Sequence, residues 1–352
     1  MNVGIIGFGQ SGKSTVYRAA AQSQAKGDVT AVPVPDGRFD QIVNQINPKK
    51  ATPATVIFHD DIESIQGGGT KMFSQRFLDQ ARKADVLLHV VRAFDSPMSP
   101  YHDDVNPIRD VENVDVELVL SDLAIIESRL ERLAKMQQTK QAGSPEYGEN
   151  AFLGRIKPII EEGTPIRALE LTEDEQKICR NYQFLSAKQT VVAFNVGEDN
   201  AAEAPEEIKK KIEELKSIGT EAFSICAMLE EEVSQLDAED QPEFLSALGL
   251  KEPANKKVVQ AIYDALGLIT FFTAGESETR AWALKRGGSA LKAADTIHSD
   301  IARGFIRAEI VSFDDYNEAG SWDAALADGK MKLEGKEYVI QDGDLLHIRN
   351  KS

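Results

Sequence analysis

The sequence is poor in several residue types, and each shortage excludes a class of protein. Its two cysteines, Cys179 and Cys226, are too few for a framework of disulfide bridges or a Cys-x-x-Cys site. No apolar run reaches the length of a membrane-spanning helix. The first apolar residues read as a strand rather than as a cleavable leader. We therefore expect a cytoplasmic protein with no membrane partner.

Basic residues are scarce as well. The 352 residues include 40 Lys and Arg against 57 Asp and Glu, which gives a net charge of −17. Broad binding to nucleic-acid backbones depends on many basic side chains that neutralise phosphates. We therefore expect no DNA partner, and we expect any contact with RNA or a ribosome to be confined to a restricted surface.

What the chain does contain predicts an α/β fold. Short apolar runs rich in β-branched residues lie at 3–6, 56–58, 86–91 and 191–194, and helical patterns follow at 13–20 and 74–83. Continuous apolar runs of this kind are typical of strands buried on both faces of a parallel sheet. The alternation predicts a doubly wound, mainly parallel sheet.

Two further segments interrupt this alternation. Apolar residues at 116, 119, 123, 126, 130 and 133 form a heptad-like stripe, and helical patterns follow at 150–162 and 173–181. They predict an inserted helical hairpin, either partly coiled coil or a pair of ordinary packed helices. After residue 268 we expect strands at 269–272 and 307–313 and a helix at 289–301. Runs at 338–340 and 345–348 around Asp342-Gly343 predict a β-hairpin, and the order fits a β-grasp module.

The strongest motif is Gly7-x-x-x-x-Gly12-Lys13-Ser14, directly after the first strand and before a helix. Backbone N–H groups of such a loop surround phosphates, and the dipole of the following helix adds to the attraction. The lysine reaches the β- and γ-phosphates, and the serine hydroxyl binds Mg²⁺. The motif predicts a phosphate-binding P-loop, with Ser14 as a metal ligand.

Two other positions complete the predicted site. Asp60 follows the strand at 56–58, where P-loop proteins place a carboxylate that supports Mg²⁺. Asn195 and Glu198 follow the strand at 191–194, where GTPases carry Asn-Lys-x-Asp to bind guanine. The longer glutamate and the Val196 that replaces lysine argue against a guanine site; the preference for ATP over GTP is what the family resemblance described below implies. Ser186-Ala187-Lys188 resembles a GTPase base motif but precedes Asn195, so we expect the segment at 225–228 to fill that role instead.

These residues resemble the YchF, or Obg-like ATPase, family of translation-factor P-loop GTPases. The likeness spans nearly the whole chain and is carried, besides the P-loop, by segments at 32–36, 53–56, 90–94, 195–198, 272–275, 280–282, 304–309, 333–336 and 339–344. The resemblance implies Mg²⁺ with bound ATP or ADP, slow hydrolysis, association with ribosomes and a C-terminal TGS domain of β-grasp fold. The nucleotide contacts that it implies are Gly9, Gln10, Ser11, Gly12, Lys13, Ser14, Thr15, Asn195, Val196 and Glu198.

The chain departs from the family in its switch regions. The Asp-x-x-Gly of the second switch reads Asp60-Asp61-Ile62-Glu63 or, shifted by one, ends at Ser64, so its glycine is absent. Thr30 is the nearby candidate for the first-switch threonine. Because that glycine normally contacts the γ-phosphate, two alternatives to a slow ATPase stay open. They are a nucleotide-binding module that hydrolyses little, and a GTP/GDP-dependent switch.

The expected domain organisation follows from these assignments. Residues 1–115 and 190–267 would form the nucleotide-binding domain, residues 116–189 the inserted helical domain, and residues 268–352 the TGS domain. Catalytic residues beyond the phosphate and metal contacts are not identified by any pattern in the sequence.

Overall fold

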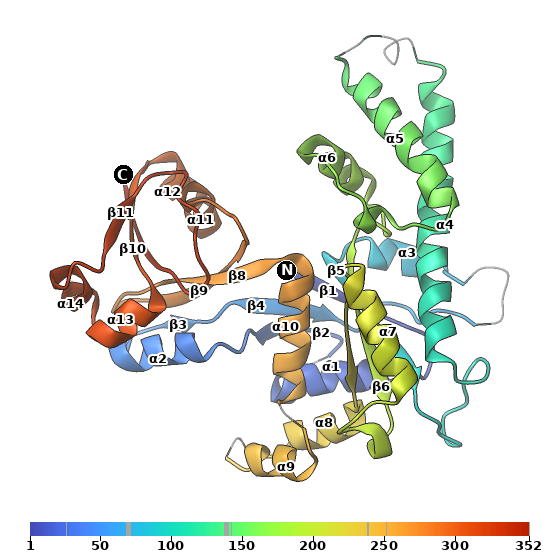
Figure 1. Cartoon of the computed structure of the whole chain (residues 1–352), viewed down its shortest axis with the longest axis horizontal. Coiled ribbons are helices and arrows are strands. Elements are labelled where there is room, and N and C mark those ends of the chain that lie inside the picture. Colours follow the sequence, from blue (N-terminus) through green and yellow to red (C-terminus); the bar gives the residue numbers. More distant parts are fainter. Residues whose placement is uncertain are drawn as a thin grey trace. The chain divides into compact units, whose positions relative to one another are not determined.

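The chain forms two compact units in the computed structural model. The model describes residues 1–25, 27–67, 72–136, 141, 143–237, 239–250 and 252–351. The larger unit comprises Met1–Ala31 and Ile57–Ala265, and the smaller unit comprises Val32–Val56 and Leu266–Ser352. Each unit has its own sheet (Figure 1).

The larger unit contains the sheet predicted for the P-loop fold, with strand order β2-β4-β1-β5-β6-β7. β1 pairs in parallel with β4 and β5, β5 with β6, and β6 with β7. The strands are β1 (Asn2–Ile6), β2 (Val29–Pro33), β4 (Thr55–His59), β5 (Val86–Ala93), β6 (Gln189–Val196) and β7 (Glu221–Ile225). The accompanying helices are α1 (Lys13–Ala21), α3 (Gln75–Ala81), α7 (Glu206–Ser217), α8 (Ala227–Ser234), α9 (Gln241–Ala247) and α10 (Ala254–Leu266).

The inserted segment is helical, as predicted, and is grouped with the larger unit. It consists of α4 (Pro107–Leu133), α5 (Pro145–Glu161) and α6 (Glu173–Tyr182). α4 begins nine residues before the predicted stripe, because Asn106 caps its N-terminus through the Arg109 N–H. The stripe then packs against α5, with Val119, Ile126 and Leu133 buried, whereas Val116 is 49% exposed and lies outside that contact.

No helix in the described part of the chain combines the length and the apolarity needed to cross a bilayer.

A buried carboxylate ties α4 to the segment before β6. Asp122 is fully buried and accepts hydrogen bonds from the N–H groups of Leu185 (3.0 Å) and Ser186 (2.7 Å). Burial raises the pKa of Asp122 to about 6, and the bonds from the Ser186 and Leu185 segment oppose that shift. Ser186 belongs to the Ser186-Ala187-Lys188 segment that resembles a GTPase base motif. Here its backbone N–H instead donates to Asp122 of α4, which is a structural contact.

The Asp122 carboxyl predicts a pH dependence of stability. Because its folded pKa lies above its unfolded value, its stabilising contribution is fully present below about pH 4. The contribution is lost as the pH rises through about 6, on the order of 3 kcal/mol in total. We expect Asp122→Asn to remove this part of the slope in urea unfolding measured from pH 4 to pH 7. An unchanged slope in the variant would contradict the assignment.

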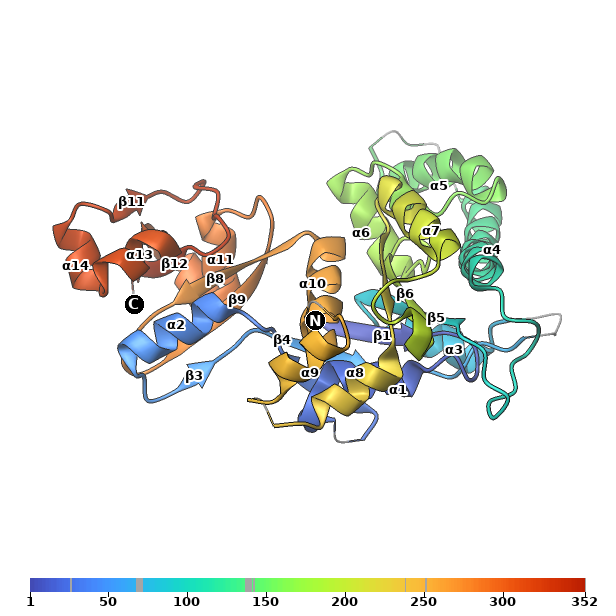
Figure 2. The same ribbon diagram turned by 60° about the horizontal axis from the view of Figure 1, so that its bottom comes forward.

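The smaller unit contains a mixed sheet of order β11-β10-β12-β8-β9-β3. Figure 2 shows α2 and β3 of this unit beside β9, although they come from a distant part of the sequence. β8 pairs with β9, and β10 with β11 and β12, in antiparallel fashion, while β12 pairs with β8 and β3 with β9 in parallel. The strands are β3 (Ala51–Thr52), β8 (Leu268–Thr273), β9 (Thr279–Lys285), β10 (Phe305–Val311), β11 (Lys332–Glu334) and β12 (Leu345–Asn350). The helices are α2 (Gly37–Ile46), α11 (Ala290–Ile297), α12 (Ser299–Arg303), α13 (Phe313–Ala319) and α14 (Trp322–Ala327).

The Asp342-Gly343 segment does not form the predicted hairpin. Val339 makes a single bridge with Ser289, and the strand that follows the turn, β12, pairs with β10 and β8. The Asp342 carboxylate accepts the N–H of Thr270 at 2.9 Å, and the Gly343 N–H donates to the Thr270 carbonyl at 2.8 Å. The turn therefore serves to align β12 beside β8.

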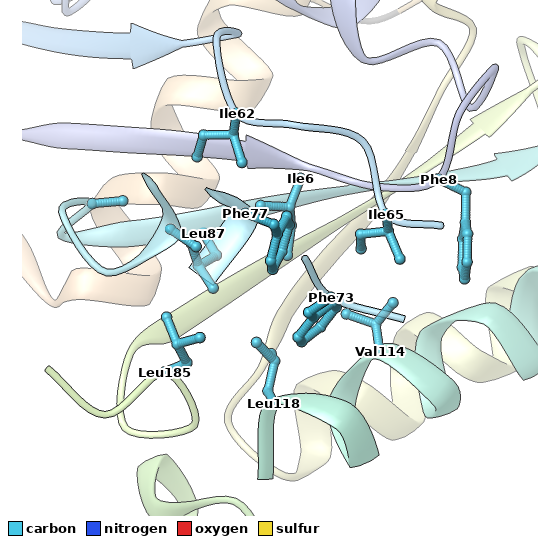
Figure 3. Close-up of a cluster of buried hydrophobic side chains, with 12 residues drawn as sticks. Ile6, Phe8, Ile62, Ile65, Phe73, Phe77, Leu87, Val114, Leu118 and Leu185 are labelled. Carbon is cyan, nitrogen blue, oxygen red and sulfur yellow. The ribbon is translucent and has the colours of Figure 1, made fainter. Parts of the chain in front are cut away.

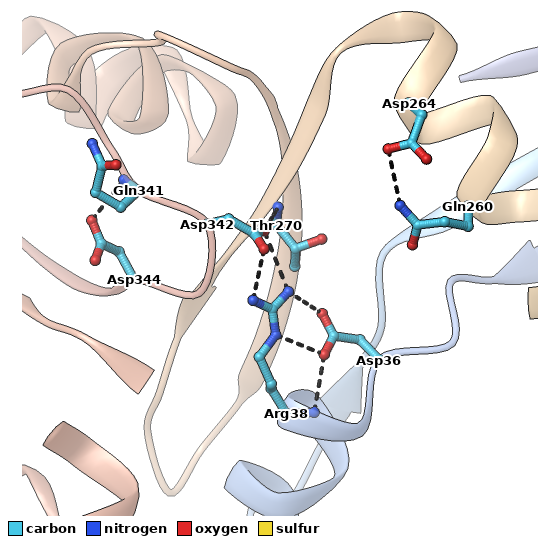
Figure 4. A network of polar contacts seen from close by, with 8 residues as sticks. All are labelled: Asp36, Arg38, Gln260, Asp264, Thr270, Gln341, Asp342 and Asp344. Carbon is cyan, nitrogen blue, oxygen red and sulfur yellow. Dashed lines mark hydrogen bonds and ion pairs between the residues drawn. The ribbon is translucent and has the colours of Figure 1, made fainter. Parts of the chain in front are cut away.

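Residues 32–56 belong to the smaller unit, whereas the sequence placed them in the nucleotide-binding domain. α2 contributes Phe39 and Ile42 to a cluster with Phe272 of β8. Arg38 donates to Asp36 within the same segment and to Asp342 at 2.8 Å (Figure 4). The Arg38–Asp342 contact spans 304 positions and the Phe39–Phe272 packing more than two hundred, so no local pattern indicates either of them.

Candidate nucleotide-binding site

The phosphate loop lies between the carboxyl end of β1 and the start of α1. Its backbone takes left-handed conformations at Gln10 (φ 62°) and at Gly12 (φ 91°), which caps α1. Gly9 and Gln10 are exposed, Ser11 is buried, and Ser14 is exposed in the first turn of α1. The predicted loop residues thus lie together at a helix N-terminus, which favours a bound anion.

Lys13 is folded back over the loop. Its ammonium group donates to the carbonyls of Gly7 (3.1 Å) and Phe8 (2.9 Å) and to the Ser64 hydroxyl (2.9 Å). Burial lowers the pKa of Lys13 to about 8, and the nearby Asp60 carboxylate opposes that shift. The lysine ammonium therefore lies against the carbonyls of the phosphate loop and the Ser64 hydroxyl.

Asp60 lies beside Ser14, the other residue for which the sequence predicts a magnesium contact. Burial raises the pKa of Asp60, while a hydrogen bond with the Ser14 hydroxyl and the charge of Lys13 act in the opposite direction. Within the described residues, Oδ1 of Asp60 is buried and has no hydrogen-bond partner, as is also true of the Ser11 hydroxyl. The Ser14 hydroxyl and the Asp60 carboxylate, whose Oδ1 is the unpaired oxygen, fit Mg²⁺, which takes few protein ligands beside phosphates and water.

Asn195 joins the phosphate loop to the segment after β7. Its Nδ2 donates to the Ser11 carbonyl at 3.0 Å, and its Oδ1 accepts the N–H of Ala227 at 3.1 Å. A Cβ on Gly12 would lie 2.2 Å from Asn195 Nδ2, so the close approach depends on glycine. The buried amide therefore supports the loop. The residues at 225–228 reach the site as predicted, whereas Ser186-Ala187-Lys188 does not join them.

A cavity of about 660 Å³ opens at the carboxyl ends of β5 and β6. Phe94, Gly197, Glu198 and Met228 are among the residues that line it. Val196 points elsewhere: its side chain is buried in the cluster between β6 and α7. Glu198 can therefore contact a base through its side chain, while Val196 can do so only through its backbone.

Thr15 also lies on α1, where its hydroxyl is 3.5 Å from an Arg18 guanidinium nitrogen. Arg18 in turn forms an ion pair with Glu231 of α8 at 2.5 Å. Thr30, the candidate first-switch threonine, is buried in β2 and accepts a hydrogen bond from Tyr17 at 2.8 Å. In this conformation the Thr30 hydroxyl is engaged away from Ser14.

Sequence reasoning missed Arg92, which is 2% exposed. Its guanidinium donates to the carbonyls of Gln10 (3.2 Å), Phe94 (3.0 Å) and Ser99 (2.9 Å). Arg92 therefore connects the phosphate loop with the loop beside the cavity. An arginine inside a strand that is apolar except for His89 was the signal that could have identified it, because buried charges need partners.

His102 was missed as well. Its ring stacks on Phe8 of the phosphate loop, with 4.1 Å between ring centres. Burial lowers the pKa of His102, and the carboxylate of Asp110 opposes the shift. No pattern in the sequence links this loop residue with Phe8.

Comparisons with known proteins show which family the chain belongs to. A family model named YchF-GTPase_C, described as a protein of unknown function (DUF933), matches residues 268–351. The Ribosome-binding ATPase YchF of Bacillus subtilis (strain 168) is 37% identical, with 99% of each chain covered. That of Pasteurella multocida (strain Pm70) is 34% identical, with 98% of each covered.

A solved structure, that of the Schizosaccharomyces pombe YchF GTPase, is 29% identical with a TM-score of 0.85 and covers 99% of this chain and 97% of its own. A GTP binding protein from Pyrococcus horikoshii OT3 is 20% identical with a TM-score of 0.66, covers both chains in full, and supports the fold alone. By full-length similarity to these relatives, this chain is a member of the YchF family.

Proposed function

We propose that this protein binds ATP with Mg²⁺ and hydrolyses it slowly while acting at the ribosome. One observation carries the proposal: Lys13, Ser14 and Asp60 are assembled at the start of α1, where a triphosphate and its metal ion require them. The two bacterial relatives are named ribosome-binding ATPases. Their similarity covers the full chain, which supports the same class of activity here.

The residues have distinct tasks in this proposal. Backbone N–H groups of Gly9 to Thr15 bind the phosphates, and Lys13 neutralises charge that develops on the transferred phosphoryl group. Ser14 and Asp60 would hold Mg²⁺, which supplies further charge neutralisation. Arg92 and Asn195 hold the loop backbone through Gln10 and Ser11.

The base is assigned as adenine. A guanine site uses a carboxylate that accepts two N–H donors, with a lysine two residues earlier in the chain. Here Val196 is buried at that lysine position, and Glu198 is exposed at the cavity. The carboxylate of Glu198 can accept one hydrogen bond from the adenine amino group.

Titration with labelled ATP and GTP tests the assignment. We expect ATP to bind at least about tenfold more tightly than GTP, a difference of about 1.4 kcal/mol. Lys13→Ala is the control and should weaken both nucleotides. Glu198→Ala should reduce the preference, because the cavity then loses its acceptor for the adenine amine. A preference for GTP would contradict the base assignment.

A second candidate function is nucleotide binding with little hydrolysis. The observation that favours it is the loss of the second-switch glycine: Ser64, at that position, contacts Lys13 through its hydroxyl. Phosphate release by the wild-type protein no faster than by Lys13→Ala, despite tight ATP binding, would establish this alternative. Faster release would establish the ATPase.

The ribosome contact is assigned to the helical segment α4–α5 and the smaller unit. Sedimentation of the purified protein with ribosomes at low salt tests this, with and without ATP. We expect co-sedimentation that weakens as salt rises, because any contact with RNA phosphates is electrostatic. Absence from the ribosomal fraction with every nucleotide would refute the assignment.

A further inference from the structure

The segment that follows β4 is anchored on both sides of Ser64. Ile62 and Ile65 are 5% and 3% exposed and lie in a cluster with Ile6, Phe8 and Phe77 (Figure 3). The Ile65 N–H donates to the Gly7 carbonyl at 3.0 Å. These two buried anchors place Ser64 directly beside the phosphate loop.

Glu63 faces the opposite direction. Its carboxylate accepts the hydroxyl of Ser74, the residue that caps α3, and its N–H donates to the Gln80 side chain at 2.9 Å. The Glu63 carboxylate is therefore directed towards α3 and away from the phosphate loop. The shifted reading, which ends at Ser64, is the one that the structure supports.

Lys13 has no ammonium hydrogen left for a nucleotide in this arrangement. A lysine ammonium carries three donors, and those of Lys13 meet two carbonyls of the phosphate loop and the Ser64 hydroxyl. The carbonyls belong to the loop itself. Ser64 is the acceptor that comes from another segment, 51 residues further along the chain.

We infer that the Ser64 hydroxyl is an internal competitor of the terminal phosphate for Lys13. This inference rests on the proposed nucleotide binding. It assigns to Ser64 a role in distinguishing ATP from ADP. ATP has to displace the hydroxyl, because the γ-phosphate takes its place on Lys13. Both nucleotides carry the β-phosphate, which meets Lys13 in place of a loop carbonyl, whereas ADP brings no γ-phosphate and leaves the Ser64 contact in place. The segment 62–65 is thereby held on the phosphate loop until a triphosphate releases it.

The test compares Ser64→Ala with wild type by calorimetric titration of ADP and of an imido-bridged ATP analogue, both with Mg²⁺. The variant removes the competitor, so we expect the analogue to bind about tenfold more tightly, as fits a hydrogen bond to a charged group. ADP affinity should change by less than about twofold. Ser64→Thr keeps the hydroxyl and should resemble wild type. Ser217→Ala, which removes a hydroxyl that donates to the Glu214 carbonyl within α7, is the matched serine control.

Each other outcome overturns the inference. Unchanged affinity for the analogue would show that the hydroxyl does not compete, and weaker binding would make Ser64 a nucleotide ligand. An equal gain in affinity for ADP would show that Ser64 does not compete with the terminal phosphate, because ADP has none. Absence of binding by folded wild-type protein would instead refute the proposed function.

A second readout needs no nucleotide. Amide hydrogen exchange at residues 62–66 should be several-fold faster in Ser64→Ala than in wild type or Ser64→Thr, because the contact with Lys13 is lost. Equal exchange rates would refute the contact even if the nucleotide proposal failed.

Discussion

A Gly7→Ala variant is expected to lose about 3 to 5 kcal/mol of stability in the larger unit, together with nucleotide binding. Gly7 has φ of 151°, and a Cβ there would lie 2.4 Å from the Val90 carbonyl oxygen and 2.9 Å from the Ser11 hydroxyl. The Val90 oxygen is backbone in β5, so it cannot turn aside. The loop or the strand must move, and either change displaces Lys13.

Gly9→Ala is the matched control in the same loop. A Cβ at Gly9 meets nothing within 4 Å. Urea unfolding without nucleotide should give a stability for this variant within about 1 kcal/mol of wild type. If Gly7→Ala unfolded at the same urea concentration as Gly9→Ala, the packing of the loop against β5 would be contradicted.

Asn195→Asp is expected to destabilise the larger unit by about 3 kcal/mol and to weaken nucleotide binding by at least about tenfold. The substitution preserves shape but replaces the donor to the Ser11 carbonyl with an oxygen. Two oxygens would then face each other at about 3 Å in a buried site. The bond from the Ala227 N–H would remain, but the bond to the Ser11 carbonyl would be lost, so residue 195 would no longer link the phosphate loop to the segment after β7.

Asn106→Asp makes the same chemical change where the side chain only accepts a hydrogen bond. Asn106 caps α4 and accepts the Arg109 N–H at 3.0 Å. A carboxylate caps a helix as well as an amide does, so thermal unfolding and nucleotide titration should match wild type. Equal effects of the two variants would show that added charge, and not the lost donor, causes the change at Asn195.

The parts of the site that could be predicted from the sequence are those whose positions follow from consecutive elements along the chain. β1, the phosphate loop and α1 follow one another directly, so spacing alone places Lys13 and Ser14. Asp60 was found because it ends a recognisable strand. By contrast, Arg92 contacts Gln10 across 82 positions, and Ser64 contacts Lys13 across 51. No periodicity or spacing indicates such pairs.

The same limit explains the errors in the fold. Asp342-Gly343 has the composition of a hairpin turn, but its partner is Thr270, 72 positions earlier. β3 is two residues long and pairs with β9, which lies more than two hundred positions away. At Asp342-Gly343 the contact with Thr270 prevails over the local preference for a hairpin turn. In β3 the two residues are too few to form a recognisable strand pattern.

The smaller unit is discontinuous along the chain, and this limits how it can be exchanged or isolated. A fragment of residues 268–351, the range that the family model matches, would lack both β3 and α2. Its sheet would then present β9 as an unpaired edge, and Phe272 would lose Phe39 and Ile42 as neighbours. Residues 268–351 therefore cannot be moved to another protein by themselves: a chimera that is to keep the smaller unit also has to include residues 32–56.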